Sequence, residues 1–315
     1  MIERHPHQSA ASDWPDLPLA AWADSCATLH LWTQVVGKIR LAHAPMINHW
    51  WQVPLYVGSR GLSTSPIPYG GESFQIDFDF IDHRLEIRTS RGEIDGFALG
   101  PRSVADFHRE IMARLSGLGL QTRIWTMPVE IEGAIPFERD SDHRSYDAAY
   151  VHRFWRILLQ VNRLFTQFRS PFLGKVSPVH FFWGSFDLAV SRFSGRTAPL
   201  LMSDSPNVGR WVMQEAYSHE VSSCGFWPGN GGFGQAAFFS YAYPEPQGFA
   251  DAPRSSATYF DRDLGQFILP YDAVRQAASP DELVMDYLRH SYEAAANLGG
   301  WDRRALERPS PNTRR

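Results

Sequence analysis

The chain has few cysteines, no long hydrophobic run and no excess of positive charge. Cys26 and Cys224 are the only cysteines in 315 residues and form no C-x-x-C pair, which argues against a disulfide framework and a four-cysteine zinc site. No run of eighteen apolar residues is present to span a bilayer. The formal net charge of −4 gives no basic surface for nucleic acid. We therefore expect neither membrane nor nucleic-acid partners.

Residues 1–15 lack the basic and then apolar layout of a secretory signal, so we interpret them as a flexible leader and expect a cytoplasmic protein. Hydrophobic residues make up 43% of the chain and aromatic residues 14%, with eleven tryptophans, which is typical of a packed globular protein. The length suits one large domain or two smaller ones.

The first half of the protein is predicted to span residues 16–137. Apolar residues at three- and four-residue spacing predict a helix that ends near Gly37. Residues 74–80 alternate apolar and polar side chains, which predicts a half-buried strand, and residues 85–89 form the returning strand of an antiparallel meander. Ser103 then begins a capped helix.

The same order of elements recurs in residues 145–303, after a polar linker at 138–144 and before a loose tail at 304–315. A long helix breaks before Pro171, aromatic strands follow, and Ser279 caps a closing helix. We predict an α+β fold of two similar helix-meander-helix halves, each an antiparallel sheet flanked by helices. An ancient duplication explains this repetition; the alternative is that helix followed by meander is common in α+β proteins.

Sequence motifs for several familiar chemistries fail on inspection. Residues 229–234 satisfy G-x-G-x-x-G, but a strand follows where the dinucleotide fingerprint requires a helix, so no nucleotide-binding motif is present. The chain has no G-x-S-x-G nucleophile elbow. His219 and Glu220 lack the second histidine of a zinc protease motif.

Aromatic, glycine and ionisable residues are concentrated in residues 178–246. Asp187 lies on a largely apolar strand, where an ionised carboxylate needs a partner, and Arg192 or Arg196 is near enough in sequence. This pair is either structural or part of a site. In a catalytic version His219 is general base or metal ligand, Asp187 orients it, and Arg192 binds an anionic group.

Aromatic side chains in the second half are candidates for the walls of a small-molecule pocket. The polar alternation of Tyr241, Tyr243 and Glu245 suits either a pocket lining or the outer face of an edge strand. His49, from the first half, is either a ligand-binding group or a core residue. The residues that we expect to bind a ligand are Trp183, Trp227, Tyr241, Tyr243, Glu245 and His49.

A divalent metal is the cofactor that these residue types suit. His49, His180 and His219 with a carboxylate would offer ligands for zinc or iron, although no spacing commits them to one site. If a metal binds, we expect His180 and His219 among its ligands.

Several of these strings together resemble an uncharacterised bacterial family, domain of unknown function 5996, from about Trp14 to Trp301. The strings are Asn48-His-Trp-Trp, Val179-His-Phe-Phe-Trp-Gly-Ser-Phe-Asp-Leu-Ala, Arg192-Phe-Ser-Gly-Arg, His219-Glu-Val-Ser-Ser, Gly225-Phe-Trp-Pro-Gly and Tyr241-Ala-Tyr-Pro-Glu-Pro. The resemblance implies a stand-alone bacterial protein and supplies no catalytic roles.

Two function classes follow from the sequence. The leading hypothesis is a binder of a small molecule, or an enzyme, with an aromatic-walled pocket in the second half. The alternative is a non-catalytic protein-interaction module in which the hairpin of residues 226–233 is an exposed contact surface. A third possibility is that the candidate site residues have a purely structural role in the core. Convergence of these groups in a concave pocket favours the first class, and a flat aromatic patch favours the second; oligomeric state is not predicted.

Overall fold

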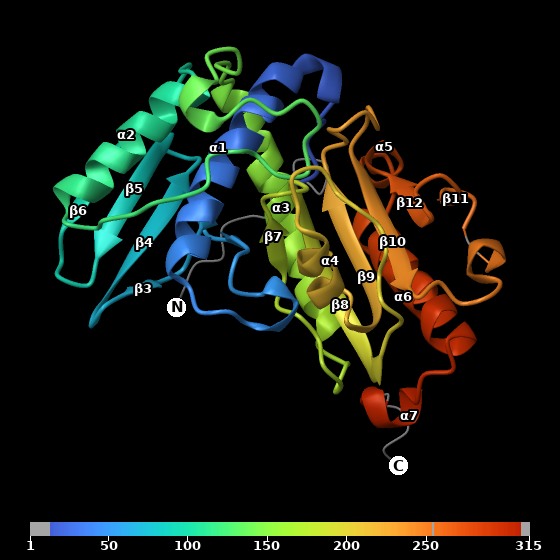
Figure 1. Ribbon diagram of the computed structural model, residues 1–315. Coiled ribbons are helices and arrows are strands. Elements are labelled where there is room, and N and C mark those ends of the chain that lie inside the picture. The colour runs from blue at the N-terminus through green and yellow to red at the C-terminus, as the bar shows by residue number, and fades with distance from the viewer. Residues whose placement is uncertain (1–12, 254, 310–315) are drawn as a thin grey trace, which may run out of the picture.

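The computed structural model describes residues 13–253 and 255–309, and its fold is α+β, which confirms the predicted class (Figure 1). The helices are α1 Ala23–His43, α2 Val104–Gly117, α3 Ala148–Arg169, α4 Arg210–Ala216, α5 Tyr271–Arg275, α6 Pro280–Leu298 and α7 Arg303–Leu306. Short 3-10 helices are η2 Leu19–Ala21, η3 Asn48–Trp50, η4 Phe137–Arg139 and η5 Phe249–Asp251. The strands are β1 Tyr56–Val57, β2 Gly61–Ser63, β3 Ile67–Tyr69, β4 Glu72–Asp79, β5 Arg84–Thr89, β6 Ile94–Ala98, β7 His180–Phe182, β8 Asp187–Thr197, β9 His219–Trp227, β10 Ala237–Tyr243, β11 Tyr259–Asp261 and β12 Gln266–Pro270.

The first sheet has the order β1-β2-β4-β5-β6, with β3 paired to β4, and its described pairs are antiparallel. On β4 the side chains of Phe74, Ile76 and Phe78 are buried, as the predicted alternation requires. Helices α1 and α2 cover this apolar face: Phe107 of α2 stacks on Phe78 and on Trp32 of α1, with ring centroids 6.3 and 4.8 Å away. The meander is therefore confirmed.

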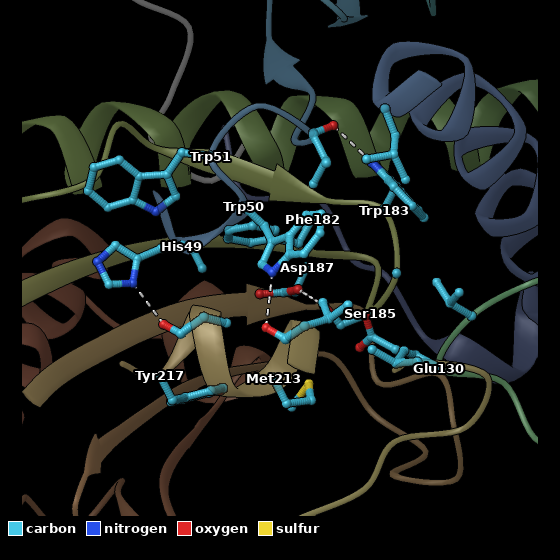
Figure 2. Close-up of a pocket in the computed structure, with 18 of the residues that line it drawn as sticks. His49, Trp50, Trp51, Glu130, Phe182, Trp183, Ser185, Asp187, Met213 and Tyr217 are labelled. Atoms are coloured by element: carbon cyan, nitrogen blue, oxygen red, sulfur yellow. Dashed lines mark hydrogen bonds between the residues drawn. The ribbon is translucent and has the colours of Figure 1, made fainter. Parts of the chain in front are cut away.

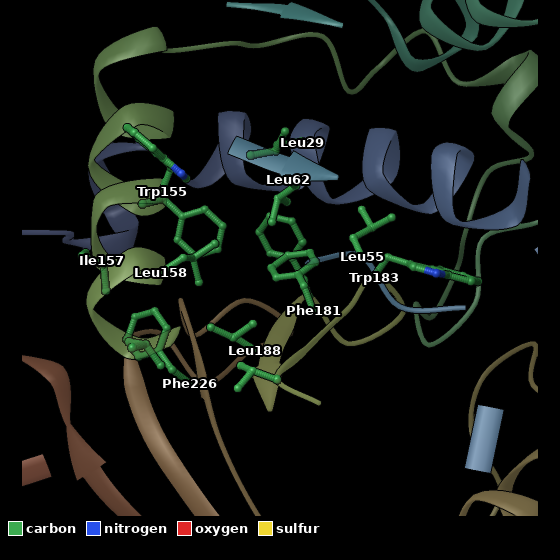
Figure 3. Packing of buried hydrophobic residues seen from close by; sticks show 14 of the residues in the cluster. Leu29, Leu55, Leu62, Trp155, Ile157, Leu158, Phe181, Trp183, Leu188 and Phe226 are labelled. Atoms are coloured by element: carbon green, nitrogen blue, oxygen red, sulfur yellow. The ribbon is translucent and has the colours of Figure 1, made fainter. Parts of the chain in front are cut away.

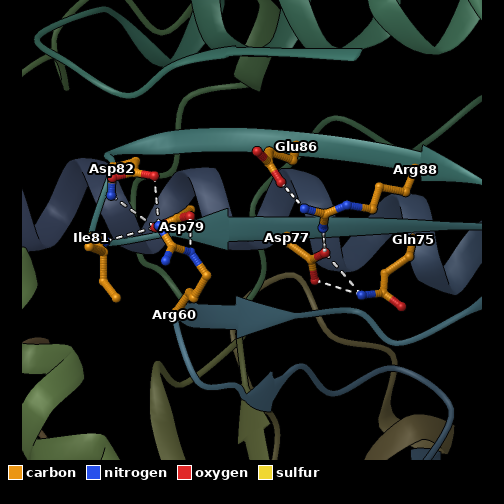
Figure 4. A network of polar contacts seen from close by, with 8 residues as sticks. All are labelled: Arg60, Gln75, Asp77, Asp79, Ile81, Asp82, Glu86 and Arg88. Atoms are coloured by element: carbon orange, nitrogen blue, oxygen red, sulfur yellow. Dashed lines mark hydrogen bonds and ion pairs between the residues drawn. The ribbon is translucent and has the colours of Figure 1, made fainter. Parts of the chain in front are cut away.

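The opposite face of the first sheet is polar (Figure 4). Arg88 pairs with Asp77 at 2.6 Å, and Arg60 pairs with Asp79 at 2.5 Å. Because the two arginines are about half exposed, each of these pairs is worth at most about 1 kcal/mol. Figure 4 shows an ordered charged surface on this face of the sheet.

The second sheet has the order β11-β12-β10-β9-β8-β7 and its described pairs are also antiparallel. Helices α3 and α6 lie on one face of it (Figure 1). Leu188 and Phe226 of this face are fully buried in the core that they share with Leu158 of α3 (Figure 3). The other face is also apolar but is not covered by a long helix, and it forms the floor of a cavity.

A pair of backbone hydrogen bonds joins the two sheets. Leu55 and Phe181 exchange two N–H to O contacts of 2.9 Å each. The Trp183 ring packs against α1 at Gly37, and its Nε1 donates to the carbonyl of Val53 at 2.9 Å. A Cβ at Gly37 would overlap the Trp183 ring. The prediction that the first helix ends near Gly37 is wrong, because this glycine makes room for a tryptophan inside α1.

Helix starts were predicted with mixed success. The Ser103 Oγ accepts from the Asp106 N–H at 3.0 Å, so the cap of α2 is confirmed. Ser279 precedes α6 and Pro280 occupies its first turn, but the Ser279 side chain makes no cap hydrogen bond. The predicted positions of Ser279 at the cap and Pro280 in the first turn of α6 are therefore confirmed, although the side-chain hydrogen bond of a capping box does not form.

The outer boundaries of the predicted domains fall on packed residues. Trp14, within the predicted leader, is only 4% exposed and lies 6.5 Å from Phe238, centroid to centroid. In the predicted tail, Glu307 forms a β-bridge with Phe172. The rest of the leader, residues 1–12, and of the tail, residues 310–315, lies outside the described residues. Duplication stays a prediction.

Among the described residues, no helix combines the length and the apolar character that crossing a bilayer requires.

Candidate functional site

A cavity of about 1220 Å³ lies on the face of the second sheet opposite to α3 and α6 (Figure 2). Its floor is apolar around Ala189 of β8 and Phe239 of β10. Helices α1 and α4, η3 and the segment 123–130 contribute to its wall. The cavity is therefore built from both halves of the chain, on a sheet that belongs to the second.

Helix α4 has only seven residues, and η3 holds it in place. The Trp50 Nε1 donates to the carbonyl of Val212 at 3.0 Å, and the His49 Nδ1 donates to that of Ala216 at 3.0 Å. His49 and Trp50 both have positive φ angles, 57° and 62°, a strained backbone that persists only where surrounding contacts maintain it. We infer that η3 anchors the helix that covers the cavity.

The second ring nitrogen of His49 is also engaged. The Lys175 ammonium donates to the His49 Nε2 at 2.7 Å, so this nitrogen acts as an acceptor and the ring is neutral. Burial, and then the Lys175 charge, lower the pKa of His49. His49 borders the cavity, but both of its nitrogens serve the structure that holds α4. Its predicted ligand-binding role stays untested.

Two carboxyl groups, Asp187 and Glu130, line the cavity (Figure 2). Asp187 is 6% exposed and accepts a hydrogen bond from the Ser185 hydroxyl. Burial raises the pKa of Asp187 to about 7, and the Ser185 hydrogen bond opposes that rise. Burial, followed by the charge of Asp187, raises the pKa of Glu130 to about 7. The two groups form a coupled pair that retains a proton near neutral pH.

Glu130 is exposed, because its side chain borders the open volume of the cavity, whereas Asp187 is buried. Among the described residues, no lysine or arginine forms an ion pair with Glu130 or Asp187. A buried carboxyl such as that of Asp187 is normally paired, so Asp187 with the neighbouring Glu130 is a candidate functional group.

The backbone around Glu130 is held from three directions. The Gln34 side chain of α1 donates to the carbonyl of Val129 and accepts from its N–H, both at 2.9 Å. The Glu130 N–H donates to the carbonyl of Pro206 at 2.8 Å. Gly184 lies beside it, and a Cβ there would displace the Glu130 carboxyl. These contacts fix a loop residue with a positive φ of 59° against the cavity.

Two tyrosines and two serines continue the polar side of the cavity. The hydroxyls of Tyr217 and Tyr241 lie 2.8 Å apart, and those of Ser191 and Ser223 lie 2.9 Å apart. Burial raises the pKa of both tyrosines, that of Tyr217 well above its usual value, and the charge of Asp187 adds to the effect. Both phenols are therefore neutral hydrogen-bonding groups at physiological pH.

The structure brings five of the predicted site residues to the cavity. They are Asp187, Trp183, Trp227, Tyr241 and His49. The indole of Trp227 packs 4.7 Å from the Phe233 ring, centroid to centroid, and donates from Nε1 to the carbonyl of Asn230 at 3.3 Å. These residues form an aromatic wall around the polar groups.

Arg192 is not part of this cavity. Its guanidinium lies on the opposite face of the sheet, 3.5 Å from the Phe168 ring centroid and 4.2 Å from that of Tyr292, and donates to the carbonyl of Phe168. Burial lowers the pKa of Arg192 to about 10. The predicted pair between Asp187 and Arg192 is wrong, because residues an odd number of positions apart on a strand point to opposite faces. Arg196 instead pairs with Glu220 at 2.6 Å.

His219 and His180 also lie outside the carboxyl pair. The His219 ring lies 5.6 Å from that of His49, and its Nδ1 is 3.1 Å from the Ser218 hydroxyl. His180 is completely buried and packs against Trp51, and burial lowers its pKa to about 3. Neither ring nitrogen of His180 has a hydrogen-bond partner in the described part of the chain.

The metal hypothesis gains no support from these positions. Over residues 13–253 and 255–309 there is no group of three or more His, Cys, Asp or Glu side chains arranged to hold an ion. The predicted metal ligation by His180 and His219 stays untested.

Tyr243 and Glu245 lie beyond the cavity. The Tyr243 hydroxyl donates to the carbonyl of Pro199 at 2.9 Å, and Glu245 is exposed. The alternative interpretation, the outer face of an edge strand, is wrong, because β10 pairs with both β9 and β12.

The sequence predictions missed Glu130, Ser185, Tyr217 and helix α4. The signal for Glu130 in the sequence is one acidic residue between Val129 and Ile131. Tyr217 lies within residues 178–246, but no pattern there predicts a role for it. The helix follows directly after residues 197–209, which have little periodicity.

The fold and the cavity define an α+β protein with two antiparallel sheets and an aromatic-walled site that contains a pair of acidic groups. The chain belongs to the family of unknown function DUF5996, whose model matches residues 14–308. No curated protein and no solved structure matches it. The predicted family is confirmed, and the family carries no assigned activity.

Proposed function

We propose that this protein binds a small, largely apolar molecule in the cavity on the second sheet. The observation that carries the proposal is the cavity itself, with a volume of about 1220 Å³. Pockets for drug-sized ligands measure about 300–1,000 Å³ and combine apolar walls with a few convergent polar groups. Aromatic walls of Trp183, Trp227 and Phe239 around Asp187 and Glu130 fit that description.

The surroundings of the glycine-rich hairpin weigh against the interaction-module alternative. Phe226 is fully buried on the helix-covered face, and Trp227 and Phe233 pack against each other beside the cavity. An exposed contact surface requires outward-facing aromatic rings. The hairpin's aromatic area therefore supports the small-molecule proposal.

The test is binding of N-phenyl-1-naphthylamine, an uncharged apolar fluorophore, to the purified full chain. We expect saturable binding with a blue-shifted emission. The variant Ala189→Trp places an indole on the cavity floor. Because this indole would fill part of the cavity, we expect the affinity of the variant for the fluorophore to fall by about tenfold or more. Ala113→Trp, on the exposed face of α2, is the matched control and should bind as the wild type does. Absence of saturable binding, or equal affinity in both variants, would refute the proposal.

An enzymatic role is a second candidate, favoured by the carboxyl pair. Two acids whose pKa values are raised to about 7 supply both a proton donor and a proton acceptor at neutral pH. The test is hydrolysis of chromogenic aryl esters and aryl glycosides by the wild type, Glu130→Gln and Asp187→Asn. Turnover that both variants lose supports catalysis, and turnover that they retain excludes a role for the pair in that reaction.

A further inference from the structure

We propose that Glu130 and Asp187 bind a positively charged nitrogen, an ammonium group, carried on an otherwise apolar ligand. This inference rests on the proposed function and specifies the class of ligand. It starts from the position of two acidic side chains on the wall of one cavity (Figure 2).

Among the described residues, no lysine or arginine forms an ion pair with these acids. Arg123 lines the cavity but pairs with neither acid. The other cations near the cavity have other partners. Lys38 donates to the carbonyl of Met127 at 2.7 Å and lies 4.6 Å from the centre of the Trp125 ring. The Lys175 ammonium donates to the His49 ring. The Arg192 guanidinium of β8 lies on the far face of the sheet. Because the buried carboxylate of Asp187 is unfavourable without a cation, a ligand cation would supply the missing charge.

Aromatic rings beside the acids suit the same group. Phe182 on β7 is the cross-strand partner of Asp187, so its ring lies on the same face of the sheet. Trp50, Tyr217 and Tyr241 line the same cavity. Ring faces attract ammonium ions, and the attraction grows when water is excluded. Acids and rings together make a site for a cation with an apolar body.

Proton exchange would accompany binding. The coupled pair retains a proton near neutral pH, and a bound ammonium ion favours its release. The other titratable groups that line the cavity are Tyr217, Tyr241, His30, Lys38, His49 and Arg123. Burial raises the pKa of both tyrosines and lowers that of His30 to about 4, so these three groups keep their charge state between pH 6 and pH 8. Burial lowers the pKa of Lys38 to about 8, so protons that come from the acids are identified by comparison with the double variant Glu130→Gln, Asp187→Asn.

Three probes with one ring system test the inference: 2-naphthylmethylammonium, 2-naphthylmethanol and 2-naphthoate. Their dissociation constants for the full chain are measured by calorimetry at pH 7.5. We expect the ammonium probe to bind at least about tenfold more tightly than the alcohol, as charge-assisted contacts in an enclosed site predict, and the carboxylate to bind most weakly. Glu130→Gln and Asp187→Asn should each reduce that preference to about threefold or less.

The matched control is Glu220→Gln, which neutralises a carboxylate on the same sheet that is paired with Arg196. It should keep the full preference for the ammonium probe. Titrations in buffers of different ionisation enthalpy should show release of up to about one proton per ammonium ligand in the wild type and none in the double variant Glu130→Gln, Asp187→Asn.

The outcomes separate the two proposals. Equal affinity for the ammonium and alcohol probes overturns this inference and leaves the small-molecule proposal standing. A preference that survives in both single variants, each shown to be folded by circular dichroism, also overturns it. Failure of all three probes to bind overturns both proposals.

Discussion

Replacement of Asp187 by asparagine should make the protein less sensitive to alkaline pH. The carboxyl is 6% exposed, and burial raises its pKa from 3.8 to about 7. The folded protein therefore keeps a proton that the unfolded chain releases. This contribution to stability is complete below about pH 4 and is lost as the pH rises through about 7.

The pKa difference sets the size of the effect. Each pH unit between the unfolded and folded pKa values corresponds to about 1.4 kcal/mol, so ionisation of Asp187 removes about 4 kcal/mol of stability once the pH exceeds the folded pKa. Asparagine has nearly the same shape and does not ionise. Between pH 5 and pH 8 the unfolding free energy of the variant should therefore rise by about 3 kcal/mol relative to that of the wild type, because the rest of the loss occurs below pH 5.

The assay is urea unfolding, followed by tryptophan fluorescence, at pH 5, 6, 7 and 8. The matched control is Asp77→Asn, because Asp77 lies on the polar face of the first sheet in an ion pair with Arg88. That replacement removes a favourable contact and should give no gain at alkaline pH. A difference between Asp187→Asn and the wild type that stays constant from pH 5 to pH 8 would refute the reasoning.

Three further predictions concern the residues around the cavity. Gly37→Ala should lower the unfolding free energy by about 1–3 kcal/mol, measured in urea, because its methyl group would overlap the Trp183 ring. Lys175→Met removes the donor to the His49 Nε2, so amide hydrogen exchange in α4 should accelerate, while an unchanged rate would contradict the anchoring role of η3. Arg192→Met should lower the unfolding free energy by about 1–3 kcal/mol, because the guanidinium packs in the core on the far face of the sheet. It should leave the affinity for N-phenyl-1-naphthylamine within twofold of the wild type. A larger loss of affinity would show that Arg192 contributes to the site.

Local patterns predicted the elements of the fold well. The alternation along residues 74–80 depends only on one buried face, and β4 has that face. The capped start of α2 depends only on neighbouring residues. The end of α1 depends on a distant contact. Glycine is a common helix terminator, but Gly37 lies inside α1 because Trp183 packs against it. No local pattern contains that information.

The prediction of Asp187 as a site residue illustrates the same division. An acidic residue on an apolar strand was correctly singled out as unusual, and it lines the cavity. Its predicted partner, Arg192, is five positions away and therefore on the opposite face, which strand periodicity alone could have revealed. Closeness in sequence therefore did not predict the ion pair, because it ignores which face of the sheet each side chain points to.

Glu130 was missed for a different reason: the two acids come from different halves of the chain. Asp187 belongs to β8, but Glu130 reaches the cavity from an irregular loop held by Gln34 of α1. The covering helix α4 is likewise anchored by His49, far away in the sequence. A site placed in the second half alone therefore omits part of its chemistry. The floor of the cavity could be predicted from strand composition, whereas its acid pair and its cover depend on contacts between the halves, which only the folded structure specifies.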